Sequence, residues 1–530
     1  MKRPDARARL ALAFSAGALS VAAFGDWPLF PLPLVALAVL CWLWARAESP
    51  RAAAWLGFAF GAGFFLVGVS WVYVSLHDFG GMPLPLAALA TLLFCLYLAL
   101  FPAVVGYVQA RLATIRPVRL VLVVPALWTL GEWLRGWLFT GVPWLALGYS
   151  QLDGPLAGLA PLGGVFGISF AAAAAAGAAA TLVVERGRGR ATALLVLVAI
   201  AIAGGALRTV DWTAPHGEPL AVSLLQGNVP QELKFVPGRY EETLATYAGL
   251  AERSNGRLIV LPETAIPRFL HEVEPAYLER LRAIAAARGG DLLVGVPVLD
   301  PERRYYNAVV SIGASPTQLY AKSHLVPFGE FLPPGFGWVV AVLKIPLGDF
   351  ARGAEHQKPL ALAGQRVAVN ICYEDAFGEE IIRPLPEATL LVNVSNVAWF
   401  GDSLAPAQHL RIARMRALET GRFMLRATNT GVTAIVDPRG AVAARLPAFT
   451  EGALEGRVEG RAGATPYVRL GNALAVSVSL AIVGWAMLAT RRTRAKARRD
   501  TDLLGDRPPV KGVPSEARRG DCPPVKGGPE

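Results

Sequence analysis

Three polar residues, Glu263, Lys322 and Cys372, lie at the ends of short apolar runs that have the composition of β-strands. A thiol that acts as a nucleophile needs a base to take its proton. A nearby cation lowers the pKa of the thiol and stabilises the oxyanion of a tetrahedral intermediate. Together, the carboxylate, the ammonium and the thiol predict a site for nucleophilic acyl transfer.

Each of these residues alone has an ordinary explanation. A cysteine at the end of an apolar strand is usually part of a core, and a single glutamate or lysine usually lies on the surface. His324 is an alternative base for a Cys–His pair, although nothing in the sequence places it near Cys372. The prediction of a catalytic site therefore depends on the three residues occurring together.

The three residues belong to a polar region, 211–467, in which short β-branched runs alternate with helical patterns. This alternation predicts a layered α/β domain with its functional groups in the loops beyond the strands. Strands are expected at 220–225, 258–261, 292–296, 308–312, 367–371, 390–394 and 432–436, and helices at 240–253 and 276–288.

Long apolar runs surround this domain. Of 530 residues, 54% are hydrophobic and 17% are charged, whereas soluble domains carry about 25% charged residues. A span of the ~30 Å hydrocarbon core needs ~20 apolar residues, and suitable or nearly suitable runs lie at 9–25, 28–45, 52–75, 84–109, 120–141, 156–183, 191–207 and 472–490. We therefore predict a polytopic membrane bundle with seven spans in residues 1–210 and an eighth in 468–490. A basic, disordered cytoplasmic tail is expected over 491–530.

Positive charges are distributed unevenly among the loops between these runs. Arginines occur in the loops at 46–51, 111–119 and 186–190, whereas 25–27, 75–83 and 141–155 contain no Lys or Arg. Because cytoplasmic loops retain positive charge, both termini are expected in the cytoplasm and the α/β domain on the outer face. The net charge of +11 therefore fits membrane topology better than nucleic-acid binding. The four cysteines show neither a disulfide framework nor zinc-type spacing, and no metal or cofactor is expected.

Two apolar features have more than one interpretation. Glu132 and Arg135, near three tryptophans at the outer end of the fifth run, form either a local ion pair within an aromatic belt or a lipid-headgroup contact. The segment Phe331–Leu347 is too apolar for a solvated loop, and it is either buried core or a lipid-facing arm.

Longer strings surround the candidate residues: Leu261-Pro-Glu-Thr264, Lys322-Ser-His-Leu-Val-Pro-Phe-Gly-Glu330, Ile371-Cys-Tyr-Glu-Asp375, Gln226-Gly-Asn-Val-Pro-Gln231, Gly136-Trp-Leu-Phe-Thr-Gly-Val-Pro-Trp144, Ala398-Trp-Phe-Gly-Asp-Ser403, Arg414-Met-Arg-Ala-Leu-Glu419 and Thr428-Asn-Thr-Gly-Val-Thr433. The first three resemble the Glu–Lys–Cys motifs of the nitrilase (carbon–nitrogen hydrolase) superfamily. The full set resembles its membrane-embedded branch, the apolipoprotein N-acyltransferase family. This resemblance extends from the first span to the eighth and implies an αββα sandwich for the inserted domain.

The resemblance also implies a role for individual residues. Glu263 would be the general base, Lys322 the oxyanion-stabilising cation and Cys372 the nucleophile. Supporting residues would be Glu330 and Glu374, which orient Lys322 and its loop, and Tyr373, which supplies a backbone N–H to the oxyanion hole; substrate-binding residues would be Phe235, Trp338 and Trp399. Two positions depart from the family pattern, because Phe235 replaces a tryptophan and Val397 replaces an aspartate.

For the reaction, the resemblance implies a ping-pong acyl transfer without a cofactor. An acyl chain would pass from a membrane phospholipid to Cys372 as a thioester, and then to the free α-amine of an S-diacylglyceryl-cysteine at the N-terminus of an apolipoprotein. The enzyme would be a monomer in the bacterial inner membrane, with its catalytic domain on the periplasmic face and no nucleic-acid partner.

Two other functions use the same sequence features. A membrane-tethered amidase would employ the triad with water as second nucleophile, but a small soluble substrate gives no reason for eight spans. A transporter or scaffold with an inactive outer domain predicts charged residues in the middle of spans, and Glu132 and Arg135, near a span end, are the only ionisable pair.

The distribution of arginines generates a test of topology. A reporter that is active only in the periplasm should be active when it is fused after Gly217 and inactive when it is fused at Arg499. Activity at Arg499 would contradict the predicted orientation.

Overall fold

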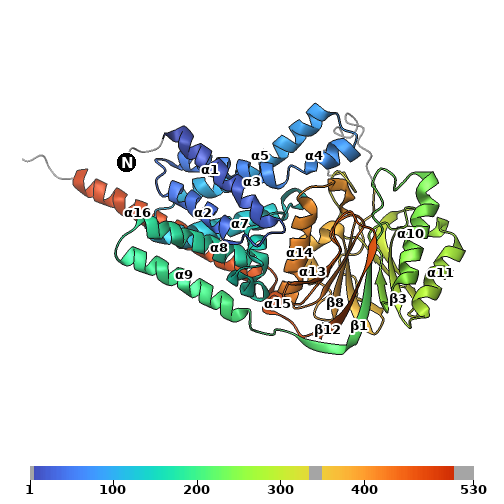
Figure 1. Ribbon diagram of the computed structural model, residues 1–530. Helices are drawn as coiled ribbons and strands as arrows, with labels where there is room; N and C mark the ends of the chain where they lie inside the picture. The colour runs from blue at the N-terminus through green and yellow to red at the C-terminus, as the bar shows by residue number, and fades with distance from the viewer. Residues whose placement is uncertain (1–4, 333–348, 506–530) are drawn as a thin grey trace, which may run out of the picture.

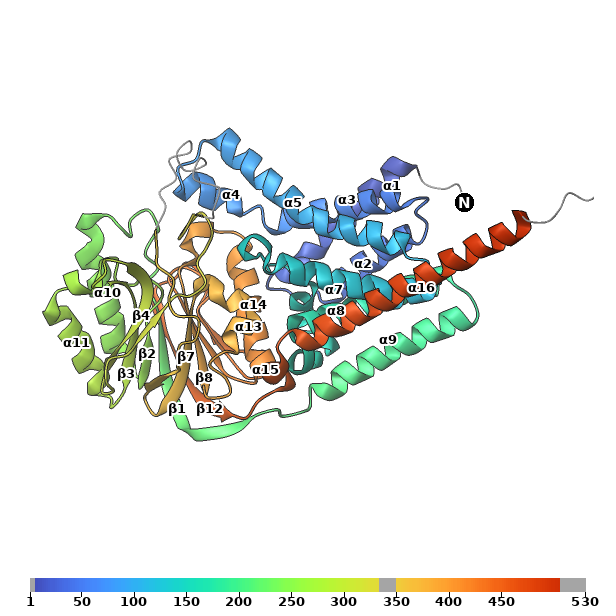
Figure 2. The ribbon, with the colours of Figure 1, turned by 180° about the vertical axis from the view of Figure 1, so that it is seen from behind.

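The structure is a computed structural model that describes residues 5–332 and 349–505. A helical bundle and an α/β domain lie side by side along the long axis of the molecule (Figures 1 and 2). The chain enters the α/β domain after α9 and returns to the bundle through α15 (Pro466–Leu470). The domain is therefore inserted between the last two helices of the bundle.

The bundle contains eight main helices among the described residues: α1 (Ala6–Ser20), α2 (Pro31–Trp44), α3 (Pro50–Gly68), α5 (Leu84–Arg111), α7 (Val124–Arg135), α8 (Ala160–Val184), α9 (Arg188–Leu207) and α16 (Ala473–Gly505). Seven helical segments in the described chain are long and apolar enough to cross a membrane. The remaining helix, α2, is equally apolar but has only 14 residues. The expected polytopic bundle of about eight spans is confirmed.

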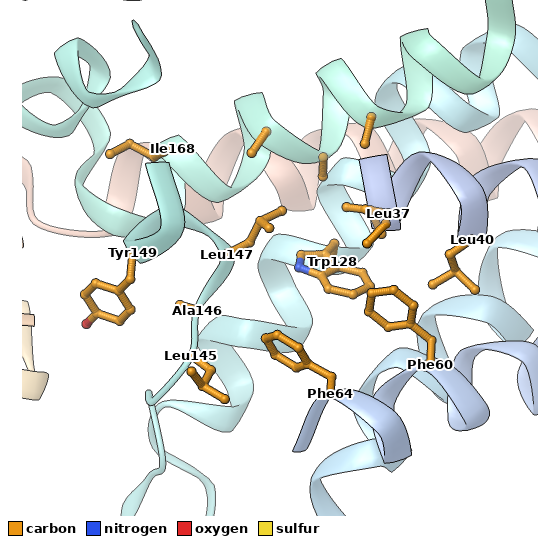
Figure 3. Close-up of a cluster of buried hydrophobic side chains, with 14 of the residues drawn as sticks. Leu37, Leu40, Phe60, Phe64, Trp128, Leu145, Ala146, Leu147, Tyr149 and Ile168 are labelled. Atoms are coloured by element: carbon orange, nitrogen blue, oxygen red, sulfur yellow. The ribbon is translucent and has the colours of Figure 1, made fainter. Parts of the chain in front are cut away.

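Close packing of α1, α3 and α5 depends on small residues. A Cβ atom on Gly17 would lie 2.0 Å from the carbonyl oxygen of Phe60, and one on Gly57 would lie 2.2 Å from that of Pro102. Helices in lipid associate through such close contacts because lipid tails are as apolar as the side chains. Larger apolar side chains, including Phe60, Phe64 and Trp128, fill the core and meet the segment Leu145–Tyr149 (Figure 3).

The α/β domain has two six-stranded sheets with the orders β12-β1-β2-β3-β4-β5 and β11-β10-β9-β8-β7-β6. The strands are β1 (Ala214–Gln226), β2 (Leu258–Val260), β3 (Asp291–Leu299), β4 (Tyr305–Gly313), β5 (Leu319–Ala321), β6 (Leu360–Leu362), β7 (Gln365–Ile371), β8 (Leu390–Ser395), β9 (Met424–Thr428), β10 (Ala434–Val436), β11 (Val442–Arg445) and β12 (Gly452–Ala462). Apolar side chains from both sheets form the core between them.

Helices cover the outer face of each sheet. The first sheet packs against α10 (Tyr240–Arg253) and α11 (Pro275–Ala286), and the second packs against α13 (Gly378–Ile381) and α14 (Ala405–Thr420) (Figure 1). This four-layer arrangement confirms the expected αββα sandwich. In each sheet the central strands are parallel, β1-β2-β3 in one and β7-β8-β9 in the other. Loops beyond the carboxyl ends of parallel strands are where α/β folds place functional groups.

Helix α14 joins the domain to the bundle, and it lies between the second sheet and the bundle (Figure 1). Gln408 Nε2 donates to the carbonyl oxygen of Gly68 at 2.9 Å, and Arg411 Nε donates to that of Gly25 at 2.7 Å. One helix of the α/β domain therefore binds the ends of two separate bundle elements.

A buried ion pair on α14 makes a third connection. Arg416 and Glu419 are both fully buried, with Nε and Oε2 3.1 Å apart. Glu419 Oε1 also accepts a hydrogen bond from the backbone N–H of Val165 at 2.7 Å. The preceding residue, Gly164, has φ 61° and interrupts α8, so Glu419 satisfies a backbone donor that the break leaves without a helical partner.

The end of the chain differs from the sequence-based expectation. Helix α16 continues past the predicted end of the span to Gly505, so residues 491–505 are helical rather than disordered. The run after Thr490 is rich in Ala, Arg and Lys, which are strong helix formers, and it extends an existing helix without a nucleation cost. Residues 506–530 lie outside the described chain. The basic end of α16 lies at the end of the bundle that is farthest from the α/β domain (Figures 1 and 2).

The buried pair on α14 generates a stability test. Glu419→Ala removes the partner of a buried guanidinium and the acceptor for Val165, and it should lower the free energy of unfolding by about 3–5 kcal/mol. Glu387→Ala, at an exposed glutamate of the same domain, should change it by less than about 0.5 kcal/mol. Thermal unfolding in detergent measures both, and equal midpoints for the two variants would contradict the anchoring role.

Candidate active site

Cys372 follows β7 directly and begins a 3-10 turn, Cys372–Ala376. Its φ of 54° lies in the left-handed region, which a residue with a side chain adopts only when its surroundings hold it there. The carbonyl oxygen of Cys372 accepts a hydrogen bond from Asn393 Nδ2 at 3.1 Å. The side chain is partly exposed although Ile371 and Glu374 beside it are buried. The turn therefore places the thiol at the end of the strand, where it packs against the edge of the core between the sheets.

Glu263 follows β2, and both of its carboxylate oxygens are held in place. Oε1 accepts from Asn307 Nδ2 at 2.7 Å, and Oε2 accepts from the backbone N–H of Asn396 at 2.7 Å. The residue is only 7% exposed. Each oxygen keeps a free lone pair, so the fixed carboxylate is able to accept a proton.

Lys322 follows β5 and lies between two carboxylates. Its Nζ is 2.8 Å from Glu330 Oε1 and 3.7 Å from Glu263 Oε1, and the side chain is 1% exposed. Burial lowers the pKa of Lys322, but the charges of Glu330 and Glu263 outweigh burial and raise this pKa well above its usual range. The ammonium therefore stays charged at every physiological pH.

The pKa of the Cys372 thiol is also raised. Burial has the largest effect and the charge of Glu263 adds to it, while the charge of Lys322 acts in the opposite direction. The resting thiol is therefore protonated at neutral pH, and it needs a base for activation.

Glu374 connects the Lys322 loop to the Cys372 turn. Its Oε1 accepts from the backbone N–H groups of Ser323 and His324 at 2.7 and 3.0 Å, and its Oε2 accepts from that of Ile371 at 2.7 Å. Burial raises the pKa of Glu374, although these N–H groups favour the charged form. Glu374 thus binds the backbone of both the loop and the turn.

Tyr373 points toward the bundle. Its hydroxyl donates to the carbonyl oxygen of Gly141 at 2.7 Å, and its ring stacks on Trp144 with centroids 6.2 Å apart. Arg135 donates to the carbonyl oxygens of Val142 and Trp144, while Glu132 accepts from the backbone N–H of Leu147 at 2.8 Å. Glu132 and Arg135 are buried and hold this loop, which favours the structural interpretation over a headgroup contact.

His324 is not placed to act as the base. Its ring stacks on Phe377 with centroids 3.7 Å apart, its Nδ1 lies 3.0 Å from Glu380 Oε1, and its Nε2 lies 3.2 Å from the carbonyl oxygen of Thr140. Both ring nitrogens are thus engaged elsewhere. These contacts favour Glu263 over His324 as the base for Cys372.

The residues expected to bind substrate divide into two groups. Phe235 and Trp399 are 61% and 39% exposed, and the Trp399 ring meets Phe79 of the bundle edge-on at 6.1 Å. Trp338 and the apolar segment around it lie outside the described residues, except for its first two positions. Val397 stands where the family resemblance leads us to expect an aspartate. Its side chain is 1% exposed and packs against Gly431. An apolar side chain fits this buried position without the cost of an unpaired charge.

Sequence reasoning missed three residues that contact the site. Asn307 and Asn396 fix Glu263, and the buried ammonium of Lys234 donates to the backbone carbonyl of Glu263 at 3.2 Å. A polar residue inside the apolar run of β4 was a signal for Asn307. Across residues 5–332 and 349–505, no cluster of three or more His, Cys, Asp or Glu side chains is arranged to hold a metal ion.

The chain matches two family models. Residues 16–178 match the apolipoprotein N-acyltransferase N-terminal domain, and residues 201–467 match carbon-nitrogen hydrolase. A protein named apolipoprotein N-acyltransferase from Nitrosomonas europaea is 50% identical over 501 residues, which cover 93% of this chain and 99% of that protein. One of the same name from Methylococcus capsulatus is 47% identical, covering 91% of this chain and 96% of its own length. Among solved structures, a carbon-nitrogen hydrolase from Helicobacter pylori aligns over 45% of this chain and 89% of its own, with 16% identity and a TM-score of 0.35.

The contacts of Glu374 generate a test of how the site is held. Glu374→Gln replaces one acceptor oxygen by an amide donor that faces N–H or O–H donors, and it should lower the free energy of unfolding by about 2–4 kcal/mol. Glu387→Gln, at an exposed glutamate of the same domain, is the control. Calorimetry in detergent compares them, and the same stability for both variants would show that Glu374 does not organise the loop.

Proposed function

The chain belongs to the apolipoprotein N-acyltransferase family, and from this premise we propose that it transfers an acyl chain from a membrane phospholipid to the free α-amine of a diacylglyceryl-cysteine at the N-terminus of apolipoproteins. The observation that carries the proposal is the buried cluster of Glu263, Lys322 and Glu330, whose charges act on the thiol of Cys372. This cluster lies in a chain whose other half is a membrane bundle.

In the first half of the reaction, Cys372 is the nucleophile. Glu263 takes the thiol proton, and the sulfur attacks the ester carbonyl at the sn-1 position of the phospholipid, for example a phosphatidylethanolamine. The carbon–oxygen bond then breaks, and the lysophospholipid leaves with the proton from Glu263. The raised pKa of Cys372 supports this order, because a thiol that is protonated at rest transfers its proton as it attacks.

In the second half, the neutral α-amine of the apolipoprotein attacks the thioester carbonyl. Glu263 accepts a proton from the amine, the carbon–sulfur bond breaks, and the proton returns to the sulfur of Cys372. The free enzyme is thereby restored, which makes the exchange a ping-pong reaction. In both halves the Lys322 ammonium and the backbone N–H of Tyr373 would stabilise the oxyanion of the tetrahedral intermediate.

The location of the site supports lipid substrates. Tyr373, next to the nucleophile, binds Gly141 of the bundle, and the exposed Trp399 contacts Phe79 of the bundle. We propose that 211–467 is the catalytic domain, that 1–210 and 468–490 are its membrane anchor, and that a monomer works on the periplasmic face of the bacterial inner membrane. Phe235, Trp338 and Trp399 are the proposed contacts for the lipid chains.

The two rival functions lack support from specific contacts. An amidase with water as second nucleophile needs no bundle, yet hydrogen bonds and stacked rings join the turn of Cys372 to it. A transporter would use ionisable groups within its spans, but Glu132 and Arg135 are bonded to the backbone of the loop that follows α7.

The proposed nucleophile is tested by intact-mass analysis of the full chain purified with phospholipid. The wild-type protein should carry a single acyl adduct, and Cys372→Ala should carry none, because the other two thiols of the described residues, Cys41 and Cys95, are buried in the bundle. Glu263→Gln and Lys322→Met should slow adduct formation about 10²–10³-fold.

Matched controls are available in the same chain. Cys41→Ala and Cys95→Ala alter buried thiols of the bundle, and Cys522→Ser alters the tail; all three should keep the adduct. An adduct in Cys372→Ala, or its loss in a control variant that remains folded, would eliminate the proposed nucleophile.

A further inference from the structure

A second lysine is buried beside the proposed triad. Lys234 lies in the connection between β1 and α10, directly before the exposed Phe235, and its side chain is 3% exposed. Its Nζ donates to the backbone carbonyl of Glu263 at 3.2 Å. This is the one hydrogen bond that the ammonium forms with the described residues.

Burying an ammonium in this way costs free energy, and a functional role would explain why the residue is kept there. A buried cation that contacts only a carbonyl dipole loses its hydration without an ion pair. Burial lowers the pKa of Lys234 to about 8, although the charges of Glu263 and Cys372 favour the ammonium. Lys322 differs, because two carboxylates compensate its burial and keep it charged. Among the described residues, therefore, no carboxylate forms a hydrogen bond with the ammonium of Lys234.

The segment that carries Lys234 is fixed to the same loop that holds the base. Gln231 Oε1 accepts from Asn396 Nδ2 at 2.8 Å, and the backbone N–H of Asn396 donates to Glu263 Oε2. Lys234 and Asn396 therefore hold Glu263 at its backbone and at its carboxylate.

The charges of the site leave a role for a second cation. Glu263 and Glu330 with Lys322 have a net charge of −1, and transfer of the Cys372 proton to Glu263 keeps that total while it moves negative charge onto the sulfur. A positive charge close to the sulfur favours this transfer. Arg426 is another buried cation coupled to Cys372, but Asp375 pairs with it at 3.2 Å. Lys234 is electrostatically coupled to both Cys372 and Glu263, which are the charged or titratable groups that face it.

We propose that Lys234 is a positioning residue of the catalytic centre, which holds Glu263 through its backbone carbonyl and supplies a second positive charge that stabilises the Cys372 thiolate. The inference rests on the proposed function of this site, and it assigns Lys234 a role that Glu263, Lys322 and Cys372 do not fill.

The test measures thiolate formation without any lipid. The full chain in detergent is treated with iodoacetamide between pH 6 and pH 10, and alkylation of Cys372 is quantified by peptide mass spectrometry. Lys234→Met removes the charge but keeps the length, and it should raise the apparent pKa of Cys372 by about one unit, which slows alkylation about 10-fold at neutral pH. Lys234→Arg should restore most of the rate. Lys358→Met, at an exposed lysine of the same domain, should react as the wild type does.

Alkylation profiles that coincide for the wild type and Lys234→Met would overturn the inference. If Lys234→Met does not fold, as judged by thermal unfolding, Lys234→Gln carries the test: a raised apparent pKa of Cys372 supports the inference, and an unchanged one overturns it. Failure of the proposed function is distinguishable, because it appears as a wild-type protein that forms no acyl adduct while its alkylation still depends on Lys234.

Discussion

The burial of the Lys322 ammonium is the constraint on which the rest of the site depends. Removing a charge from water is costly, and it is tolerated only where opposite charges and hydrogen bonds replace the lost hydration. Here Glu330 and Glu263 supply the charges, and Asn307 donates to both carboxylates at 3.0 and 2.7 Å. Because these groups come from separate strands and loops, the sandwich must be fully assembled before the cluster is stable.

The same requirement explains why the nucleophile is tied to the membrane bundle. The turn of Cys372 is held from within the domain by Glu374, and from the bundle by the contacts of Tyr373 with Gly141 and Trp144. Trp144 in turn donates to Gln408 of α14 at 2.7 Å. A turn with a left-handed residue at its first position is thus supported on both sides, and two packed bodies fix the orientation of the thiol.

Much of the fold and part of the site could be predicted from the sequence, because they depend on local patterns. Apolar runs long enough to span a bilayer and β-branched runs between helical patterns are properties of neighbouring residues, and both predicted the observed architecture. Likewise, Glu263, Lys322 and Cys372 stand within recognisable strings. Asn396 and Lys234 escaped prediction because their roles arise from contacts across 133 and 29 positions of the chain. The helix over residues 491–505 was not predicted. A highly charged composition indicates disorder, but the same residues have a high helix propensity.

The interruption of α8 has a consequence for the order in which the molecule is built. Synthesis from the N-terminus delivers Val165 to the bilayer long before Glu419 exists. During that interval the backbone N–H of Val165 lacks its eventual acceptor, and hydrocarbon does not tolerate an unsatisfied amide. The α/β domain then supplies the carboxylate of Glu419, 254 positions later in the chain. The hydrogen bonding of a bundle helix is therefore completed by a residue of the domain that packs against it.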